Sequence, residues 1–163
     1  MDTSLETSDF NKTLAPWIGK TAKLINLYIA DVFKEHAIQV TKEQWIVLKI
    51  LNEDFDGVIQ NELAFITNRN KASLTRLITI MEKNHLVKRI SFAGDARKNQ
   101  IFITQNGREL FLKMKPLMLQ SIEHFQQGIS LEEKAIFINI MKKIQTNLKT
   151  DVSESKNSLN PIK

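Results

Sequence analysis

The residues of this 163-residue chain that are best suited to chemistry lie close together, between positions 70 and 98. Ser73, Thr75 and Arg76 alternate with apolar residues there, and Arg97 follows in a polar stretch. Hydroxyl groups bind base edges or phosphates, and an arginine binds guanine through two hydrogen bonds. The pattern is therefore typical of a DNA contact, although an amphipathic helix with a solvated polar face has the same spacing.

Two short helices are expected to carry these side chains. Residues 59–67 are predicted to form the first helix, residues 68–70 a turn, and residues 71–83 the second helix. In the second helix four apolar residues recur at i, i+3, i+4 and i+7 and face inward, namely Leu74, Leu77, Ile78 and Met81. Such a pair is a helix-turn-helix, whose second helix can lie in the major groove of DNA.

A β-hairpin is predicted directly after these helices. Residues 86–92 (LVKRISF) and 100–104 (QIFIT) are short strand-forming runs, and the polar residues 93–99 are expected to join them as a loop. A helix-turn-helix followed by a basic-tipped hairpin is a winged helix. Val58 and Ile59 are expected to add a brief strand to this hairpin.

Helices are also predicted before this region. Asp9 is a plausible N-cap for a long helix ending near His36, and Pro16 is expected to kink it or to move its start to about Ala15. Thr41 and Gln44 form a capping box that opens a helix ending near Glu53.

Two further helices are predicted after the hairpin. Thr104 is expected to cap a helix that ends near Gln127, with a kink at Pro116 and Gly128 as its C-terminal stop. Ser130-Leu-Glu-Glu133 is a second capping box, and it opens a final helix to about Leu148.

Five fragments of the chain, in order and at matching spacing, resemble the DNA-binding core of the MarR (multiple antibiotic resistance regulator) family of bacterial transcription factors. The fragments are Thr41-Lys-Glu-Gln-Trp-Ile-Val-Leu48, Asn61-Glu-Leu-Ala64, Leu74-Thr-Arg-Leu77, Leu86-Val-Lys-Arg89 and Asp95-x-Arg97-x-x-x-Ile101-x-Ile103-Thr104-x-x-Gly107. The last resembles the family's wing signature and is the most specific. The chain departs from the family at Asn84-His85, where many relatives have Gly, and at Ile103, which replaces a frequent Leu.

The resemblance implies a mainly α fold with a small β-hairpin wing, in which a winged helix-turn-helix core is flanked by long N- and C-terminal dimerisation helices. The apolar stripes of the long helices also favour a second copy, the alternative being a monomer whose helices pack on one another. The expected organisation is a disordered segment over residues 1–8, one domain over 9–150, and a mobile tail over 151–163. Within that domain we expect dimerisation helices over 9–36 and 105–150 and the DNA-binding core over 41–104.

The charge distribution supports a nucleic-acid partner. The chain carries a net charge of +5, and residues 68–98 alone hold eight basic and two acidic side chains, so the rest of the chain is close to neutral. Neutralisation of phosphates requires such a concentration of positive charge. A solvated charged face is the alternative, but it gives no reason for the concentration.

No catalytic, metal-binding or cofactor-binding site can be recognised in the sequence. Cysteine is absent, and His36, His85 and His124 stand apart from one another and from other ligand types. There is no nucleophile elbow and no phosphate-binding loop. We therefore expect a protein that is not an enzyme and that has no catalytic residue, metal or cofactor. With no membrane span or secretory pattern, it is expected to be cytoplasmic.

These observations predict a homodimeric, sequence-specific regulator of transcription that binds double-stranded DNA at an inverted-repeat operator. The residues expected to contact DNA are Asn70, Lys71, Ser73, Thr75, Arg76, Arg97 and Lys98. Asp95 is expected to orient the wing or to pair with a nearby arginine. The resemblance further implies a repressor released by a small aromatic or phenolic effector, whose binding residues are not assigned. The alternative is a winged-helix module that binds proteins without reading DNA.

Overall fold

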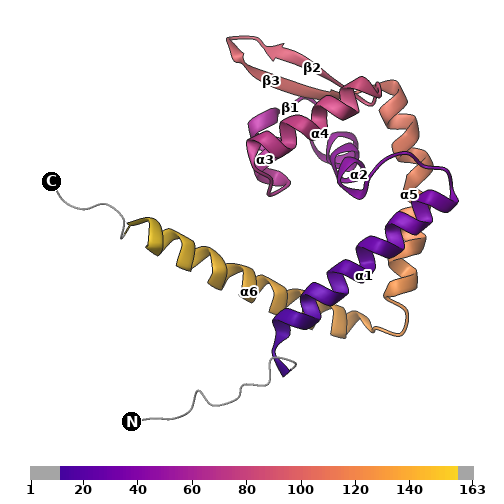
Figure 1. The fold of residues 1–163 in the computed structure, drawn as a ribbon, viewed down its shortest axis with the longest axis vertical. Coiled ribbons are helices and arrows are strands. Elements are labelled where there is room, and N and C mark those ends of the chain that lie inside the picture. Colours follow the sequence, from indigo (N-terminus) through magenta and orange to yellow (C-terminus); the bar gives the residue numbers. More distant parts are fainter. Residues whose placement is uncertain (1–11, 158–163) are drawn as a thin grey trace. The chain divides into compact units, whose positions relative to one another are not determined.

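The computed structural model describes residues 12–157, without the side chains of Ala96 and residues 150–157. The chain divides into two units, Met1–Phe125 and Gln126–Lys163, each of which is described by itself. The elements of the first unit are α1 (Leu14–Glu35), α2 (Lys42–Lys49), η2 (Ile50–Asp54), β1 (Val58–Ile59), α3 (Gln60–Ile66), α4 (Lys71–Lys83), β2 (Val87–Phe92), β3 (Asp95–Ile103) and α5 (Gln105–Phe125) (Figure 1). The second unit contains α6 (Leu131–Asn157).

Helix α1 begins at Leu14 with Thr13 at its N-cap, so the predicted later start near Ala15 is close to the observed one. Pro16 occupies the first turn, where backbone N–H groups have no partner within the helix, and the helix therefore runs on to Glu35 without a break. The other predicted cap, Asp9, lies outside the described residues.

The capping box at the start of α2 is confirmed. Thr41 Oγ1 accepts a hydrogen bond from the Gln44 N–H at 3.3 Å, and Gln44 Oε1 accepts one from the Thr41 N–H at 3.0 Å. The helix predicted to end near Glu53 has about the expected extent, but only its first part is α-helical, because α2 ends at Lys49 and the chain continues as the π-helical turn η2 to Asp54. In that turn the Phe55 N–H donates to the Ile50 carbonyl at 2.9 Å, a bond one residue longer than in an α-helix.

The three strands form an antiparallel sheet in the order β1-β3-β2, so the expected short strand before the helix-turn-helix is confirmed. The predicted loop over residues 93–99 is wrong in most of its length, because β3 already begins at Asp95. The turn itself needs only Ala93 and Gly94, since Gly94 adopts a φ of +110° that other residues rarely adopt. The register shift between Ser91 and Phe92 then accommodates the additional residues of β3.

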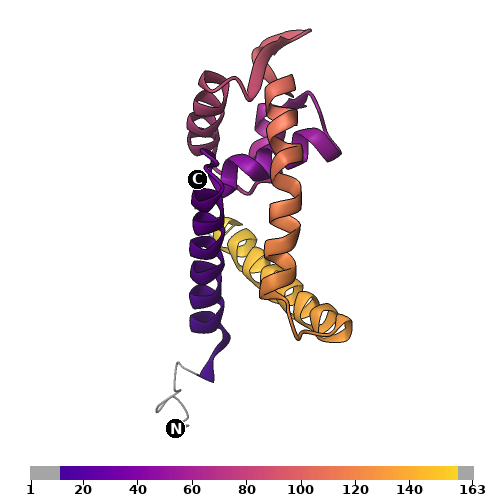
Figure 2. The ribbon, with the colours of Figure 1, turned by 90° about the vertical axis from the view of Figure 1, so that its right-hand side faces the viewer.

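One core holds the winged helix together. Helices α2, α3 and α4, the three strands and the start of α5 contribute its apolar residues, among them Leu48, Leu63, Leu74, Ile78, Met81, Val87, Ile101 and Phe111. A second cluster joins α1 to α5 and consists of Ile29, Phe33, Ile38, Met114 and Met118. Accordingly, α1 and α5 lie side by side in both views (Figures 1 and 2).

Helices α5 and α6 begin as predicted and end differently. Thr104 Oγ1 accepts a hydrogen bond from the Gly107 N–H at 3.0 Å and so caps α5, which continues through Pro116 and ends at Phe125. In the second unit, Ser130 and Glu133 exchange the two bonds of a capping box, at 3.1 and 2.7 Å. Helix α6 then runs to Asn157, beyond the expected end near Leu148. No helix in the part of the chain described by the structure is long and apolar enough to cross a membrane.

Candidate nucleic-acid interface

Helix α4 spans the predicted residues, Lys71 to Lys83, and is anchored through one face. Leu74, Ile78 and Met81 are fully buried on that face, while Lys71, Thr75, Arg76 and Thr79 are exposed. Helix α3 precedes it across the turn at residues 67–70, where Asn68 has a φ of 52°. The two helices thus form the helix-turn-helix that the sequence predicted, with α4 in the position of the recognition helix.

Some predicted DNA-contacting side chains already have partners within the protein. Asn70 is the N-cap of α4, and its Oδ1 accepts a hydrogen bond from the Ser73 N–H at 2.8 Å. Ser73 is half-buried, and its hydroxyl accepts a bond from Arg69 Nη1 at 3.2 Å. These two side chains therefore stabilise the turn and the first turn of α4.

Thr75 also uses its hydroxyl group internally. Its Oγ1 donates to the Lys71 carbonyl at 2.8 Å and accepts from Gln60 Nε2, of α3, at 2.9 Å. The γ-methyl group and one lone pair are left for other contacts. In contrast, the side chains of Lys71 and Arg76 make no hydrogen bond or ion pair with any described residue, so these two cations are free to bind an anion.

The tip of the wing presents a second positive site. Arg97 follows the turn of the hairpin, and its side chain is 92% exposed. Asp95 Oδ1 accepts hydrogen bonds from the Arg97 N–H at 3.1 Å and from Arg97 Nε at 3.2 Å. Lys98 Nζ lies 3.6 Å from Asp95 Oδ2. The structure thus brings together the three wing residues that the sequence singled out.

Electrostatics favour this arrangement of Asp95. The hydrogen bond from the Arg97 backbone, followed by that from the Arg97 side chain, lowers the pKa of the Asp95 carboxyl below its ordinary value. Asp95 therefore stays ionised at neutral pH and holds the base of the Arg97 side chain in place. The expectation that Asp95 pairs with a nearby arginine fits Arg97, which lies in the same hairpin, rather than Arg76 of α4.

The base of the wing is fixed to the first turn of α5. The Thr104 N–H donates to the Leu86 carbonyl at 3.1 Å, and Thr104 Oγ1 donates to the His85 carbonyl at 2.6 Å. Gly107 lies so close to the strand that a Cβ atom there would stand 2.1 Å from the Leu86 carbonyl oxygen. The final glycine of the quoted wing fragment is therefore required by a close approach of two backbones.

One residue that connects the wing to α4 was missed by the sequence reasoning. Arg89 of β2 forms an ion pair with Glu82 of α4, with 3.5 Å between Nη1 and Oε2, and also bonds to Thr75 and Thr79. Its position in the fragment Leu86-Val-Lys-Arg89 gave no indication of this role. The role of Arg89 follows only from its contacts with α4, and the alternation of residues along β2 does not show these contacts.

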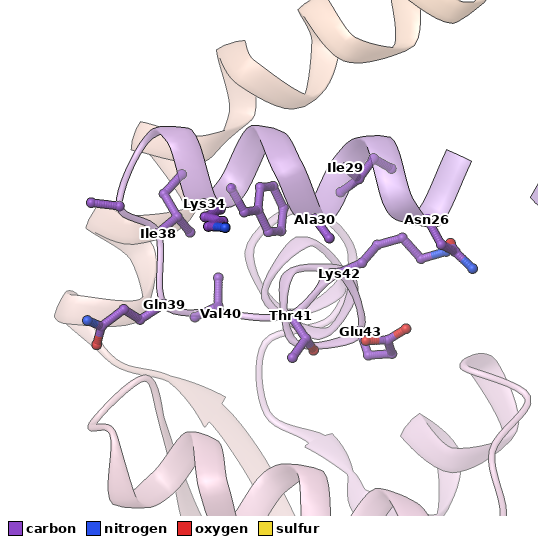
Figure 3. Close-up of a pocket in the computed structure, with 12 residues that line it drawn as sticks. Asn26, Ile29, Ala30, Lys34, Ile38, Gln39, Val40, Thr41, Lys42 and Glu43 are labelled. Atoms are coloured by element: carbon purple, nitrogen blue, oxygen red, sulfur yellow. The ribbon is translucent and has the colours of Figure 1, made fainter. Parts of the chain in front are cut away.

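Away from α4, a cavity of about 520 Å³ lies where the end of α1, the connection after it and the start of α2 meet (Figure 3). Ile29, Phe33 and Ile38 give it an apolar wall. At one end Asn26 and Lys42 point toward each other, and Lys42 Nζ donates a hydrogen bond to Asn26 Oδ1 (Figure 3). Among the described residues, no group of three or more His, Asp or Glu side chains is placed to hold a metal ion.

The helix-turn-helix with its three-stranded sheet makes this chain a winged-helix protein. Residues 40–98 match the model of the MarR family. The transcriptional regulator HosA of Escherichia coli O157:H7 is 25% identical over 123 residues, which cover 71% of this chain and 90% of HosA. Over its winged-helix core the chain is therefore similar to the MarR family, and over most of its length to a transcriptional regulator.

Solved structures show the same fold. AbsC, a MarR family transcriptional regulator from Streptomyces coelicolor, superposes with a TM-score of 0.79 at 22% identity, covering 88% of this chain and 97% of AbsC. A MarR protein from Peptoclostridium difficile DA00132 superposes with a TM-score of 0.75 at 19% identity, covering 95% of this chain and 96% of that protein. The predicted fold class, mainly helical with a small hairpin wing, is confirmed.

Proposed function

We propose that the protein is a homodimeric, sequence-specific double-stranded DNA-binding regulator, and that it represses transcription until a small-molecule effector releases it. The observation that carries this proposal is the pairing of two free cations on the exposed face of α4, Lys71 and Arg76, with the exposed Arg97 at the wing tip. A protein with this role works in the bacterial cytoplasm, where the DNA is.

Two grooves are engaged at each half-site. Helix α4 enters the major groove, where Arg76 binds base edges and Lys71 binds a phosphate. Thr75 contributes its methyl group, which suits contact with thymine, while Asn70 and Ser73 approach the backbone at the start of the helix. Arg97 and Lys98 reach the adjacent minor groove, where the negative potential attracts a guanidinium group.

A second copy is proposed to cover the apolar surface that the chain leaves open. In α6, Phe137 is 58% exposed and Leu148 62%, and in α1, Trp17 is 60% exposed. Because so much exposed apolar surface is unfavourable in water, the long helices of two chains are expected to pack together. A two-fold dimer sets its two α4 helices about one DNA turn apart, roughly 34 Å, and therefore reads an inverted repeat.

The effector is proposed to be a small aromatic or phenolic compound. The cavity between α1 and α2 has about 520 Å³, within the range of small-ligand sites, and combines an apolar wall with the polar ends of Asn26 and Lys42. A phenol or carboxylate accepting a hydrogen bond from Lys42 fits this lining. The cavity adjoins Thr41, the residue that caps α2, so a bound ligand can shift the winged helix relative to α1.

The test is quantitative binding of DNA by Arg76→Ala and Arg97→Ala. The cognate duplex is the sequence that the wild-type protein enriches from a random library, and a scrambled duplex is the reference. Arg76→Ala should cost about 1–3 kcal/mol on the cognate duplex and much less on the scrambled one. Arg97→Ala should weaken both and reduce the salt dependence by about one unit for each contact removed.

Lys113→Ala is the matched control, since it removes one exposed positive charge from α5, outside the proposed interface. It should leave the affinity for the cognate duplex close to that of the wild type. If Arg76→Ala and Arg97→Ala bind the cognate duplex as the control does, this surface does not contact DNA. The protein-binding alternative then becomes the better account.

A further inference from the structure

Arg89 connects the wing to α4 through both its backbone and its side chain. The Arg89 N–H donates to Glu82 Oε1 at 3.1 Å, and Nη1 lies 3.5 Å from Glu82 Oε2. Nη2 donates to Thr79 Oγ1 at 2.8 Å and to the Thr75 carbonyl at 3.1 Å. One residue of β2 thus contacts three residues of α4.

The three partners lie on a single face of the helix. Thr75, Thr79 and Glu82 are spaced i, i+4 and i+7, so the contacts of Arg89 extend over two helical turns. Strand β2 is at the edge of the sheet, and the Arg89 N–H is not used in pairing with β3. The Glu82 carboxylate accepts a hydrogen bond from this N–H, which would otherwise be left without a partner at the edge of the sheet.

From these contacts we propose that Arg89, held by Glu82, is a positioning residue for DNA recognition. It fixes the angle between the wing and α4, so that Arg97 and Arg76 engage the same half-site. The inference rests on the proposed DNA-reading function. It adds a residue that touches no DNA itself, because its guanidinium group is directed at α4.

The length of the wing makes this angle important. The turn at Ala93 and Gly94 lies on the order of 15 Å beyond Arg89, at about 3.3 Å per strand residue. A tilt of about 10° at Arg89 therefore displaces the tip by about 3 Å, as much as a whole hydrogen bond. Without the contacts between Arg89 and α4, Arg97 and Arg76 would engage their grooves independently of each other.

A role in stability alone is a poor explanation of the same contacts. The side chains of Arg89 and Glu82 are 23% and 39% exposed, and partly exposed ion pairs contribute little to folding. Their loss should lower the melting temperature by about 1–4 °C. The effect on recognition should be much larger, since it depends on the position of the wing tip.

The test compares Arg89→Ala and Glu82→Ala on the cognate and scrambled duplexes, in the full-length protein. Arg89→Ala should lower the affinity for the cognate duplex about tenfold or more, with only a small loss on scrambled DNA. Glu82→Ala is the sharper variant, because it removes a negative charge. Electrostatics alone would strengthen binding to both duplexes, whereas positioning predicts a loss on the cognate duplex only.

Two further variants make the test specific. Lys88→Ala is the control, because Lys88 is the neighbouring cation of β2, is exposed and stands 5.8 Å above the Phe102 ring, away from α4. Its ratio of cognate to scrambled affinity should equal that of the wild type. Arg89→Lys keeps the charge but cannot reproduce the forked contacts of a guanidinium, and its ratio should fall as in Arg89→Ala.

A double-mutant cycle completes the test. Arg97→Ala should weaken cognate binding at least threefold less in the Arg89→Ala protein than in the wild type, because the wing tip is already misplaced. Equal effects in both backgrounds, or tighter binding of Glu82→Ala to both duplexes, would overturn this inference and leave the proposed function intact. If the wild type enriches no sequence from the random library, the proposed function itself fails.

Discussion

On the exposed face of α4, the hydroxyl groups and the cations have separate tasks. Thr75 and Thr79 direct their hydroxyl protons to carbonyl groups one turn back, at 2.8 Å in each case, and accept bonds from Gln60 and Arg89. Lys71 and Arg76 have no such partner among the described residues. Under the proposed function, base reading should therefore depend on Arg76 more than on the threonines, whose hydroxyl groups bond to neighbouring residues.

Gly107 offers a stability test at the level of a single residue. Gly107→Ala would place a Cβ atom 2.1 Å from the Leu86 carbonyl oxygen and 3.0 Å from Ile103 Cγ1, so backbone or strand must move. We expect a loss of about 1–3 kcal/mol in the free energy of unfolding, measured by urea denaturation. DNA binding should weaken as well, because the base of the wing shifts.

Gly19→Ala is the control for this substitution. Gly19 lies within α1, where an added Cβ atom would meet nothing within 4 Å. Because Ala is the better helix former, this variant should gain about 0.5–1 kcal/mol. Equal stability of Gly107→Ala and the wild type would show that α5 and Leu86, the residue before β2, are not held together by this close approach.

At the level of elements, the predictions from the sequence were most accurate where contacts between residues close in sequence determine the structure. Thr104 and the two capping boxes placed the starts of α5, α2 and α6 correctly, because a cap is a contact between residues close in sequence. The periodic stripe of α4 likewise identified Leu74, Ile78 and Met81 as buried.

Where non-local contacts decide, the sequence was less informative. The polar run from Asp95 to Asn99 reads as a loop, yet it belongs to β3 because Gly94 permits a tight turn and β2 provides a partner strand. The contacts of Arg89 with α4 have no signal in the spacing of either element. The candidate site could therefore be located from the sequence, but the coupling between its two halves could not.

The capping box of Ser130 and Glu133 provides a prediction at the level of an element, because the carboxyl group of Glu133 can be protonated. Hydrogen bonds from the Ser130 backbone, followed by the Ser130 side chain, lower the pKa of the Glu133 carboxyl. A carboxyl with a lowered folded pKa contributes stability that is present above its unfolded pKa and is lost as the pH falls through the folded pKa. The start of α6 should therefore fray in acid.

The measurement is a carboxyl NMR titration combined with amide exchange at the start of α6. The pKa of Glu133 should lie below the usual range of glutamate and rise only part of the way toward it in Ser130→Ala, which removes the hydroxyl group but keeps the Ser130 N–H. Glu133→Gln should remove the pH dependence of exchange. The box of Thr41 and Gln44 is the internal control, because an amide does not titrate. A normal Glu133 pKa in the wild type would contradict this account of the cap.

At the level of the whole molecule, the apolar side chains of α6 are poorly buried within one chain. None of its described side chains is fully buried, and the large apolar residues Ile136, Phe137 and Ile138 are all more than half exposed. In a winged-helix regulator this surface sets the distance between two recognition helices, provided that a second copy covers it. DNA recognition and self-association are then linked, because a single half-site offers only half of the contacts.

The last prediction tests this link through Phe137→Glu and Ile140→Glu, which place two negative charges one turn apart on α6. Burial of a large apolar side chain contributes about 1.5–3 kcal/mol, so loss of two such side chains should weaken a dimer by a factor of about 10² or more. Sedimentation at micromolar concentration should show a folded monomer that has lost cognate binding. Gln145→Glu adds one negative charge at an exposed polar position of α6 and should stay dimeric. A double variant that remains a dimer, or a monomer that binds the inverted repeat as tightly as the wild type, would mean that α6 does not join two copies for DNA recognition.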